Sequence, residues 1–495
     1  MNAPAAAPFA IARQREVVDA LRAVLPPGAV LFNEEVTRPY ECDGLAAYRQ
    51  LPMVVVLPAD EAHVIAAMNV CRRLQAPIVP RGAGTGLSGG AMPIADGVVI
   101  STARLNRIVR LDPYSRTAIV QPGVRNLAIS EAAGAHGLYY APDPSSQIAC
   151  TIGGNVAENS GGVHCLKYGL TVHNVLRVRM ITIDGEVAEL GSEALDAAGL
   201  DLLALFIGSE GMLGVVTEVT VRLIPKPQQA RVIMASFDDV VKGGNAVANV
   251  IAAGIIPAGL EMMDKTSSRM VEPFVHAGYD TEAEAILLCE SDGLPDEVDE
   301  EIARMEEVFR HAGATAIAVS QSEAERLKFW SGRKNAFPAA GRISPDYYCM
   351  DGTIPRRNLA QVLLGIAEME KKYGLRCANV FHAGDGNLHP LILFDANKPG
   401  EFDRAEHFGA EILELCVAVG GTITGEHGVG IEKINSMCVQ FSQAELDAFR
   451  AVKQAFDTAL LLNPDKAIPS LRRCAEYGRM HVRAGKLPFA DLPRF

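Results

Sequence analysis

The sequence predicts an α+β protein built from more than one folding unit. Its 495 residues correspond to roughly three units at about 150 residues each. With 49% hydrophobic and 21% charged residues, the composition is that of a globular chain and not of a disordered or fibrous one. Strand-like and helix-like segments alternate in the first half, whereas strands and helices interleave less regularly after residue 228.

The first domain is expected over residues 51–227, after a helical lead-in over 1–50. The lead-in has apolar residues at helical spacing between Arg and Glu. It lacks the basic-then-apolar order of a signal peptide, so we expect a cytoplasmic chain. The domain ends at Pro225-Lys-Pro227, and its predicted elements are strands 53–57, 77–80 and 97–101, helix 59–74 and three longer strands between 118 and 223.

A second, α+β domain that carries the substrate site is expected over residues 228–410. The uncharged run 243–260 is interrupted by Gly, Asn and Pro, and it is interpreted as a buried helix and strand, not as a membrane span. Residues 411–495 are predicted as a helical segment that completes the active site, with a glycine-rich break at 420–430. The remaining predicted elements are strands 230–237, 284–291, 347–355, 379–386 and 388–395 and helices 296–312 and 358–373.

Charge and cysteine spacing exclude several classes of function. The 46 Lys and Arg against 59 Asp and Glu give a net charge of −13, which repels nucleic acids and anionic lipid headgroups. The two closest of the ten cysteines, Cys150 and Cys165, are 15 residues apart, which excludes local zinc ribbons and ferredoxin-type clusters. We expect the cysteines to be reduced core residues.

A glycine cluster at residues 81–90 matches the GxGxxG pattern at Gly84, Gly86 and Gly89. A Rossmann turn must open a helix, but the Gly-Gly-Ala-Met-Pro that follows cannot begin one. The cluster is therefore predicted as a loop whose backbone N–H groups converge on an anion, the alternative being a tight connection without a ligand. Two further glycine-rich stretches, 142–162 and 208–223, favour one extended ligand that lies across all three.

These stretches carry a family resemblance. RGAGTGLSGG (81–90), PDPSSQIACTIGGNVAENSGG (142–162), KYGLT (167–171) and GSEGMLG (208–214) resemble the FAD-binding domain of vanillyl-alcohol-oxidase-type flavoproteins. From YECDGL at 40–45 to RCAEYGRMHV at 473–482, the chain resembles the FAD-containing catalytic subunits of bacterial glycolate oxidase. The loops offer no evident histidine for covalent attachment, with His164 the nearest, so non-covalent FAD is expected. The resemblance implies cofactor contacts from Arg81, Gly82, Ala83, Gly84, Thr85, Gly86, Leu87, Ser88, Pro142, Asp143, Ser145, Ser146, Gly153, Gly154, Asn155, Asn159, Gly161, Gly162, Gly208, Glu210, Gly211, Gly214 and Val215.

A second cluster of functional residues surrounds the segment from His382 to His389. Apolar residues flank a Gly-Asp-Gly-Asn turn, which predicts a β-hairpin that brings the two imidazoles to one face. With Glu426 from the break at 420–430 they would form a divalent-metal site, the alternative being two histidines held by backbone hydrogen bonds.

Related flavin-dependent D-2-hydroxyacid dehydrogenases carry the same HxGDGNxH and GEHG motifs. That resemblance implies that His382, His389 and Glu426 ligate a divalent metal such as zinc, that Asn387 contacts substrate and that His427 is the general base. Removal of a hydroxyl proton needs a base with a pKa near neutrality, which histidine supplies.

Arg333 is the predicted partner of the substrate carboxylate, by resemblance to an FWxxR element, and an ordinary surface arginine is the alternative. Relatives acting on larger dicarboxylates carry a Lys in the strand before the following Asp, where this chain has Tyr348-Cys349-Met350. That difference favours a small monocarboxylate such as glycolate or D-lactate.

The expected function is oxidation of such a 2-hydroxy acid, glycolate to glyoxylate or D-lactate to pyruvate. The resemblance implies that electrons pass to a second FAD-binding-type subunit and an iron–sulfur subunit, with membrane association only peripheral, through these partners at the inner membrane. The alternatives are a stand-alone D-lactate or D-2-hydroxyglutarate dehydrogenase and a non-catalytic, FAD-loaded scaffold subunit.

Overall fold

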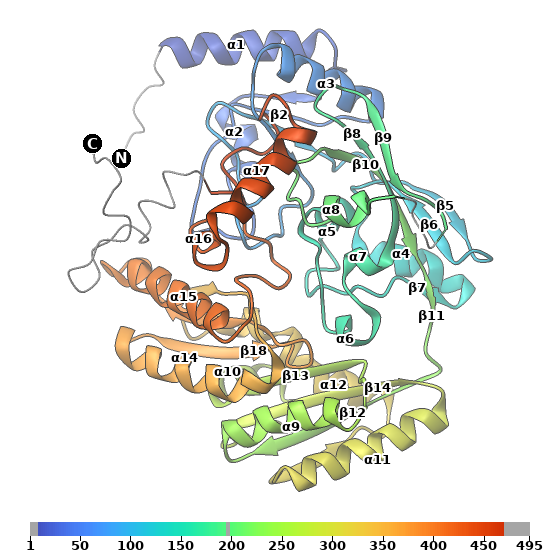
Figure 1. Cartoon of the computed structure of the whole chain (residues 1–495), viewed down its shortest axis with the longest axis vertical. Helices are drawn as coiled ribbons and strands as arrows, with labels where there is room; N and C mark the ends of the chain where they lie inside the picture. Colours follow the sequence, from blue (N-terminus) through green and yellow to red (C-terminus); the bar gives the residue numbers. More distant parts are fainter. Residues whose placement is uncertain (1–7, 195–198, 470–495) are drawn as a thin grey trace.

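The computed structural model describes residues 8–194 and 199–469. The upper part in Figure 1 holds the elements up to residue 225, and the lower part holds the strands and helices between residues 229 and 418. The C-terminal helices α16 (Met437–Gln440) and α17 (Gln443–Phe456) return to the upper part. Among the described residues, no helix is long and apolar enough to cross a lipid bilayer.

The upper part contains two main sheets. The first has the order β1-β2-β4-β3, in which β4 lies parallel to both β2 and β3. The second, β5-β6-β10-β8-β9, is antiparallel throughout. The bounds are β1 Val30–Leu31, β2 Val54–Val56, β3 Ile78–Arg81, β4 Val98–Ser101, β5 Ile108–Asp112, β6 Thr117–Val120, β8 Val175–Ile181, β9 Val187–Gly191 and β10 Val215–Arg222. A short pair, β7 (Leu138–Tyr139) with β11 (Ile224–Pro225), lies beside the point where the chain leaves this part.

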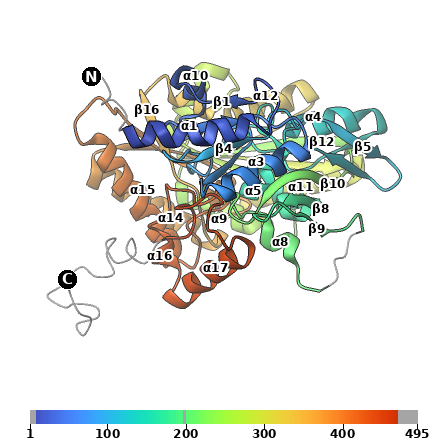
Figure 2. The same cartoon turned by 90° about the horizontal axis from the view of Figure 1, so that it is seen from above.

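Helices cover these sheets and connect their strands. The helix α3 is capped by the Asp60 carboxylate, which accepts a hydrogen bond from the His63 amide, and α1 lies along it in Figure 2. The bounds are α1 Pro8–Arg22, α2 Glu34–Thr37, η1 Arg38–Tyr40, α3 Glu61–Arg73, α4 Asn126–Ala133, η2 Gly134–His136, α5 Ile152–Glu158, α6 Cys165–Tyr168, α7 Thr171–Asn174 and α8 Leu202–Phe206.

One antiparallel seven-stranded sheet organises the lower part, with the order β15-β12-β14-β13-β18-β20-β16. Successive side chains of a strand face opposite sides. Thus Met262 of β13 packs in the core that includes α9 and α14, and Met263 packs in the core that includes α10 and α12. The strands are β12 Gln229–Phe237, β13 Gly259–Asp264, β14 Ala285–Gly293, β15 Ala316–Val319, β16 Asp346–Cys349, β18 Arg376–Phe381 and β20 Pro390–Phe394, with the pair β17 Gly352–Thr353 and β19 Asn387–Leu388. The helices are α9 Val240–Ala252, α10 Lys265–Val275, α11 Pro295–His311, α12 Glu323–Lys334, α13 Ala336–Ala340, η3 Arg356–Asn358, α14 Leu359–Tyr373 and α15 Glu401–Ala418.

Several predictions from the pattern of apolar residues are confirmed. The run 243–260 forms α9 and the start of β13, and no helix follows the glycine cluster at 81–90. The stretch 142–162, however, is not a loop throughout, because 152–158 folds as α5. Ile152, Asn155 and Val156 are buried at the three-to-four-residue spacing of a helix face, which outweighs its two glycines.

The prediction of reduced core cysteines is confirmed for seven residues, half met by Cys42 and wrong for Cys438, and Cys474 lies outside the described residues. The thiols of Cys42, Cys71, Cys150, Cys165, Cys289, Cys349, Cys377 and Cys416 are free, and all but Cys42 are buried. Cys438 is disulfide-bonded. Spacing along the chain could not indicate this bond.

The segment after α17 is joined to the first sheet. The Ile78 amide donates to the Leu461 carbonyl at 2.7 Å, and the Asn463 amide donates to the Ile78 carbonyl at 2.6 Å. The Asn463 side-chain amide donates to the carbonyls of Gly90 and Glu210, at 2.9 Å and 2.6 Å. Residues 461–463 therefore fix two of the glycine-rich loops.

Candidate active site

A cavity of about 580 Å³ lies between the two parts. Its upper wall is formed by residues 80–87 and by parts of the stretches 144–160 and 206–216. Its lower wall includes Lys334, Phe337 and Tyr347, together with His389, Glu426 and His427. The size is in the range of cofactor pockets.

Sixteen of the residues predicted to contact the cofactor line this cavity. They are Arg81, Gly82, Ala83, Gly84, Thr85, Gly86, Leu87, Ser145, Ser146, Gly153, Gly154, Asn155, Glu210, Gly211, Gly214 and Val215. The other seven lie outside its wall, within the loops. They are Ser88, Pro142, Asp143, Asn159, Gly161, Gly162 and Gly208. Asp143, for example, accepts hydrogen bonds from the amide and ring Nδ1 of His164.

The glycine-rich loop after β3 packs so closely against neighbouring residues that Gly82 and Gly84 have no room for a side chain. A Cβ on Gly82 would lie 2.5 Å from the Thr151 hydroxyl, and Gly84, with φ +72°, faces the Arg81 guanidinium. Thr151 itself lines the cavity, and its buried hydroxyl has no hydrogen-bond partner in the described part of the chain. A tight backbone cradle and an unpaired hydroxyl fit a bound flavin nucleotide.

The hairpin predicted around His382 and His389 forms as β18 and β20, and it brings the two rings to 5.1 Å between centroids. The Nε2 atoms of His382 and His389 lie 3.3 Å and 3.2 Å from the same oxygen, Oε1 of Glu426. The buried Nε2 of His389 has no hydrogen-bond partner among the described residues. Two imidazoles and one carboxylate converge on one point, as a tetrahedral metal site with an open position requires.

Electrostatics favour positive charge at that point. Although burial opposes protonation of His382, the carboxylates of Glu261 and Glu426 raise its pKa to about 10. His382 and His389 in turn hold the pKa of Glu426 well below its usual range, against the opposing effect of burial. The three residues fit a divalent cation at this point.

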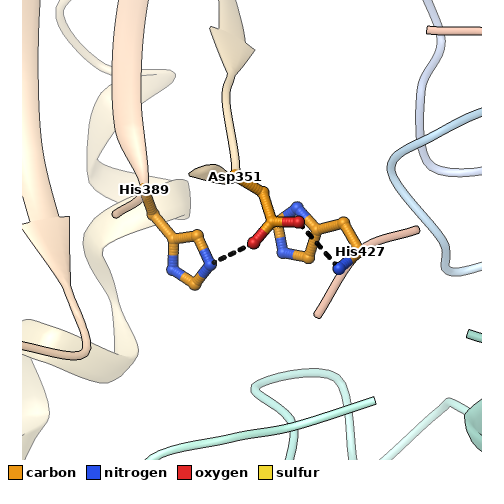
Figure 3. Close-up of side chains that lie close together, drawn as sticks. All are labelled: Asp351, His389 and His427. Atoms are coloured by element: carbon orange, nitrogen blue, oxygen red, sulfur yellow. Dashed lines mark hydrogen bonds and ion pairs between the residues drawn. The ribbon is translucent and has the colours of Figure 1, made fainter. Parts of the chain in front are cut away.

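A second cluster, Asp351, His389 and His427, shares His389 with the first (Figure 3). The buried Asp351 carboxylate already accepts hydrogen bonds from Lys433 Nζ at 3.0 Å, from the Thr424 hydroxyl at 2.6 Å and from the backbone amides of residues 425, 426 and 427. Its oxygens are thus used to hold the loop that carries Glu426 and His427. The first cluster is the better cation site.

His427 lies on the cavity wall and stacks on His389, with centroids 4.8 Å apart. Burial lowers its pKa to about 4, against the attraction of Asp351. This value is below the near-neutral one expected from the sequence, because the ring is desolvated. His427 is therefore neutral at pH 7 and able to accept a proton.

The other two predicted catalytic residues lie behind the cavity wall. Arg333 is 2% exposed and pairs with Glu261, whereas its neighbours Lys334 and Asn335 line the cavity. Asn387 is buried, and a Cβ on Gly425 would lie 1.9 Å from its amide nitrogen. Arg333 is thus not the surface arginine of the alternative interpretation.

Four residues that organise the site received no role from the sequence. They are Glu261, Asp351, Lys433 and the cavity-lining Thr151. Asp351 follows a strand in Cys-Met-Asp-Gly, which is a signal for a functional carboxylate. The sequence position of Glu261, inside a buried strand, is the only sign of its importance.

Glu210 connects the glycine-rich loops to the loop that carries Glu426 and His427. Its carboxylate accepts hydrogen bonds from the amides of Val429 and Gly430, both at 2.7 Å. Gly161 lies close to the same loop, since a Cβ there would lie 2.6 Å from Oε2 of Glu426. The glycine-rich loops and the cluster of His382, His389 and Glu426 are therefore parts of one site.

Two models of known protein families match this chain. Residues 52–191 match the family model "FAD binding domain", and residues 226–467 match "FAD linked oxidases, C-terminal domain". The fold is that of p-cresol methylhydroxylase, at 16% identity and a TM-score of 0.77 over 93% of this chain and 98% of that one. Fold and site thus define an FAD-linked oxidoreductase of the vanillyl-alcohol-oxidase type.

Within this class the chain belongs to the family of glycolate oxidase GlcD subunits. It is 64% identical to the glycolate oxidase subunit GlcD of Escherichia coli K12, over 97% of this chain and 96% of that one. It is 38% identical to the subunit of the same name from Bacillus subtilis, over 86% and 91%. A D-lactate dehydrogenase of Anaerostipes hadrus is 31% identical over 89% and 95%.

Proposed function

We propose that this enzyme oxidises a small 2-hydroxy acid, glycolate in the first place, to the 2-oxo acid. The observation that carries this proposal is the convergence of His382, His389 and Glu426 on one point, with His389, Glu426 and His427 on the wall of the flavin-sized cavity. The relatives named as glycolate oxidase subunits and D-lactate dehydrogenase support the substrate class.

The residues of this chain divide the reaction between them. His427, neutral at pH 7, takes the hydroxyl proton while the Cα–H bond breaks and its electron pair leaves with the hydrogen. Bound FAD, held without a covalent link, supplies the two-electron acceptor for that hydride. A divalent metal such as zinc, held by His382, His389 and Glu426, would polarise the hydroxyl oxygen and lower its pKa.

Arg333 and Asn387 complete the proposed substrate site. Arg333 lies behind the cavity wall, and it is assigned to the substrate carboxylate because Glu261 binds its Nε and leaves the fork of Nη groups for a second carboxylate. Asn387, next to the metal-binding loop, is assigned to a substrate oxygen. Replacement of Arg333 by Lys should raise KM for glycolate more than replacement of the cavity-lining Lys334 by Gln. A larger increase in KM for the Lys334 variant would instead assign the substrate carboxylate to Lys334.

Reduction of the bound flavin under anaerobic conditions tests the function directly. Glycolate, D-lactate, L-lactate and D-2-hydroxyglutarate are each mixed with the FAD-loaded chain, and absorbance near 450 nm is followed. Bleaching fastest with glycolate supports the proposal. Preference for D-lactate or D-2-hydroxyglutarate would favour a stand-alone dehydrogenase of that acid, and no bleaching with any acid would favour a non-catalytic scaffold.

We further propose that electrons leave through partner subunits, a second FAD-binding-type subunit and an iron–sulfur subunit. The cysteine spacing offers no local cluster motif, and the relatives are themselves named as subunits. The chain would act in the cytoplasm and reach the inner membrane only through those partners. Turnover with a quinone analogue by the isolated chain, at the rate of the assembled complex, would contradict this route.

A further inference from the structure

A buried carboxylate, Glu261, joins two proposed parts of the active site. It lies on β13 and is 0% exposed. One oxygen, Oε1, lies 2.6 Å from Nδ1 of His382, and the other, Oε2, pairs with Nε of Arg333. Glu261 therefore contacts both the histidine assigned to the metal and the arginine assigned to the substrate.

Three different elements meet at this carboxylate. Residue 261 is in the middle of β13. In the antiparallel pairing of β13 with β18, Met262 lies opposite Phe381, so the residues next to them, Glu261 and His382, lie close together. Arg333 comes from the end of α12, and its side chain is 2% exposed. Because a buried guanidinium is costly without a counter-charge, Glu261 determines where Arg333 can lie.

The contact also determines the tautomer of His382. A carboxylate only accepts hydrogen bonds, so the Nδ1 atom of His382 must carry a hydrogen. A cation that binds between His382 and Glu426 takes the place of the hydrogen on Nε2, which faces Glu426 at 3.3 Å, while Glu261 keeps the other hydrogen on Nδ1. An orienting carboxylate of this kind usually raises metal affinity by 10- to 100-fold.

We infer that Glu261 is a positioning residue that holds His382 in its metal-binding tautomer and fixes Arg333 beside it. The inference rests on the proposed function for the identity of the metal site. It adds a residue that does not line the cavity and that links the proposed metal site to the proposed substrate site through one side chain.

The test is Glu261→Gln in the FAD-loaded chain, with the affinity for Mn²⁺ measured by competition with a chelator. The amide keeps the shape but places an NH₂ group against either His382 or Arg333. We expect Mn²⁺ affinity to fall by about 10- to 100-fold and KM for glycolate to rise. The visible spectrum of the Co²⁺-loaded variant should change as well, because it reports the geometry of the ligands.

Asp264→Asn is the matched control. Asp264 ends the same strand, and its carboxylate accepts hydrogen bonds from the Ser267 amide and the Asn379 side chain, away from the metal cluster. It should lower thermal stability while Mn²⁺ affinity and the Co²⁺ spectrum stay unchanged. Equal Mn²⁺ affinity in native and Glu261→Gln chains would overturn the inference.

These outcomes are distinct from failure of the proposed function. If the native chain binds Mn²⁺ and Glu261→Gln does not, the inference holds even when no hydroxy acid bleaches the flavin. If glycolate bleaches the flavin and the native chain binds no divalent cation, the inference and the metal site are overturned while the substrate proposal stands.

Discussion

The rings of His389 and His427 are stacked in parallel, at 4.8 Å between centroids and an angle of 3°. One ring is a proposed metal ligand and the other the proposed base. The stack limits how His427 can rotate, so the base keeps one orientation toward the cavity. A cation on His389 would also disfavour protonation of the neighbouring ring before substrate arrives.

Replacement of His427 by Ala should slow flavin reduction by about 10²- to 10⁴-fold, the usual contribution of a general base. FAD should remain bound, because the glycine-rich loops are unaffected. Stopped-flow bleaching with glycolate measures the rate, and His407→Ala on the exposed side of α15 is the control. An unchanged rate with bound FAD would show that another group takes the proton.

Removal of the metal should abolish substrate oxidation reversibly. Dialysis against a chelator should lower the rate of flavin reduction, and Mn²⁺ or Zn²⁺ should restore it, as expected if the cation orients the hydroxyl. In His389→Ala the added cation should restore nothing, because the ligand itself is missing. Full activity after verified metal removal would contradict the metal site.

Gly82→Ala should weaken FAD binding. Its Cβ would lie 2.5 Å from the Thr151 hydroxyl, so the loop or Thr151 must move out of the cradle. Gly341→Ala is the control, since the nearest atom to its Cβ is 3.6 Å away. Titration of the apoproteins with FAD should show weaker binding only for Gly82→Ala, and equal affinities would place the nucleotide elsewhere.

The contact between His164 and the two carboxylates of Asp143 and Glu290 should make stability depend on pH. Burial disfavours the charged ring, but Asp143 and Glu290 raise the pKa of His164 well above 6.5. Because the pKa of His164 is higher in the folded chain, its charged ring stabilises the folded state fully at pH values below the pKa in the unfolded chain, about 6.5. This stabilisation is lost as the pH rises through the pKa in the folded chain.

His164→Gln should therefore destabilise the protein more at pH 6 than at pH 9.5. Urea unfolding at both values measures the difference. His136→Gln, at an exposed position, should show no such dependence. A destabilisation that grows with pH would contradict a charged His164.

Local patterns predicted what depends on neighbours in the sequence. The alternation of strands and helices, the non-Rossmann loop at 81–90 and the hairpin that brings the rings of His382 and His389 together all follow from spacing and turn residues. The hairpin in particular needed only a Gly-Asp-Gly-Asn turn between two apolar runs.

Contacts between distant segments could not be predicted in this way. Glu261 meets His382 only because β13 pairs with β18, and the shift of His427 to a pKa of about 4 arises from burial by the whole fold. The same is true of Arg333, whose burial depends on a carboxylate 72 positions away in the chain. Long-range register and desolvation are properties of the folded molecule.

The bonds from Leu461 and Asn463 to Ile78, Gly90 and Glu210 have a consequence for how the protein is made. A ribosome releases the chain from its N-terminus, so the glycine loops emerge hundreds of residues before the segment that fastens them. The flavin cradle cannot reach its final form until that segment has left the exit tunnel. Loading of FAD should thus be a late, post-synthetic step, and chains halted before residue 461 should emerge without tightly held flavin.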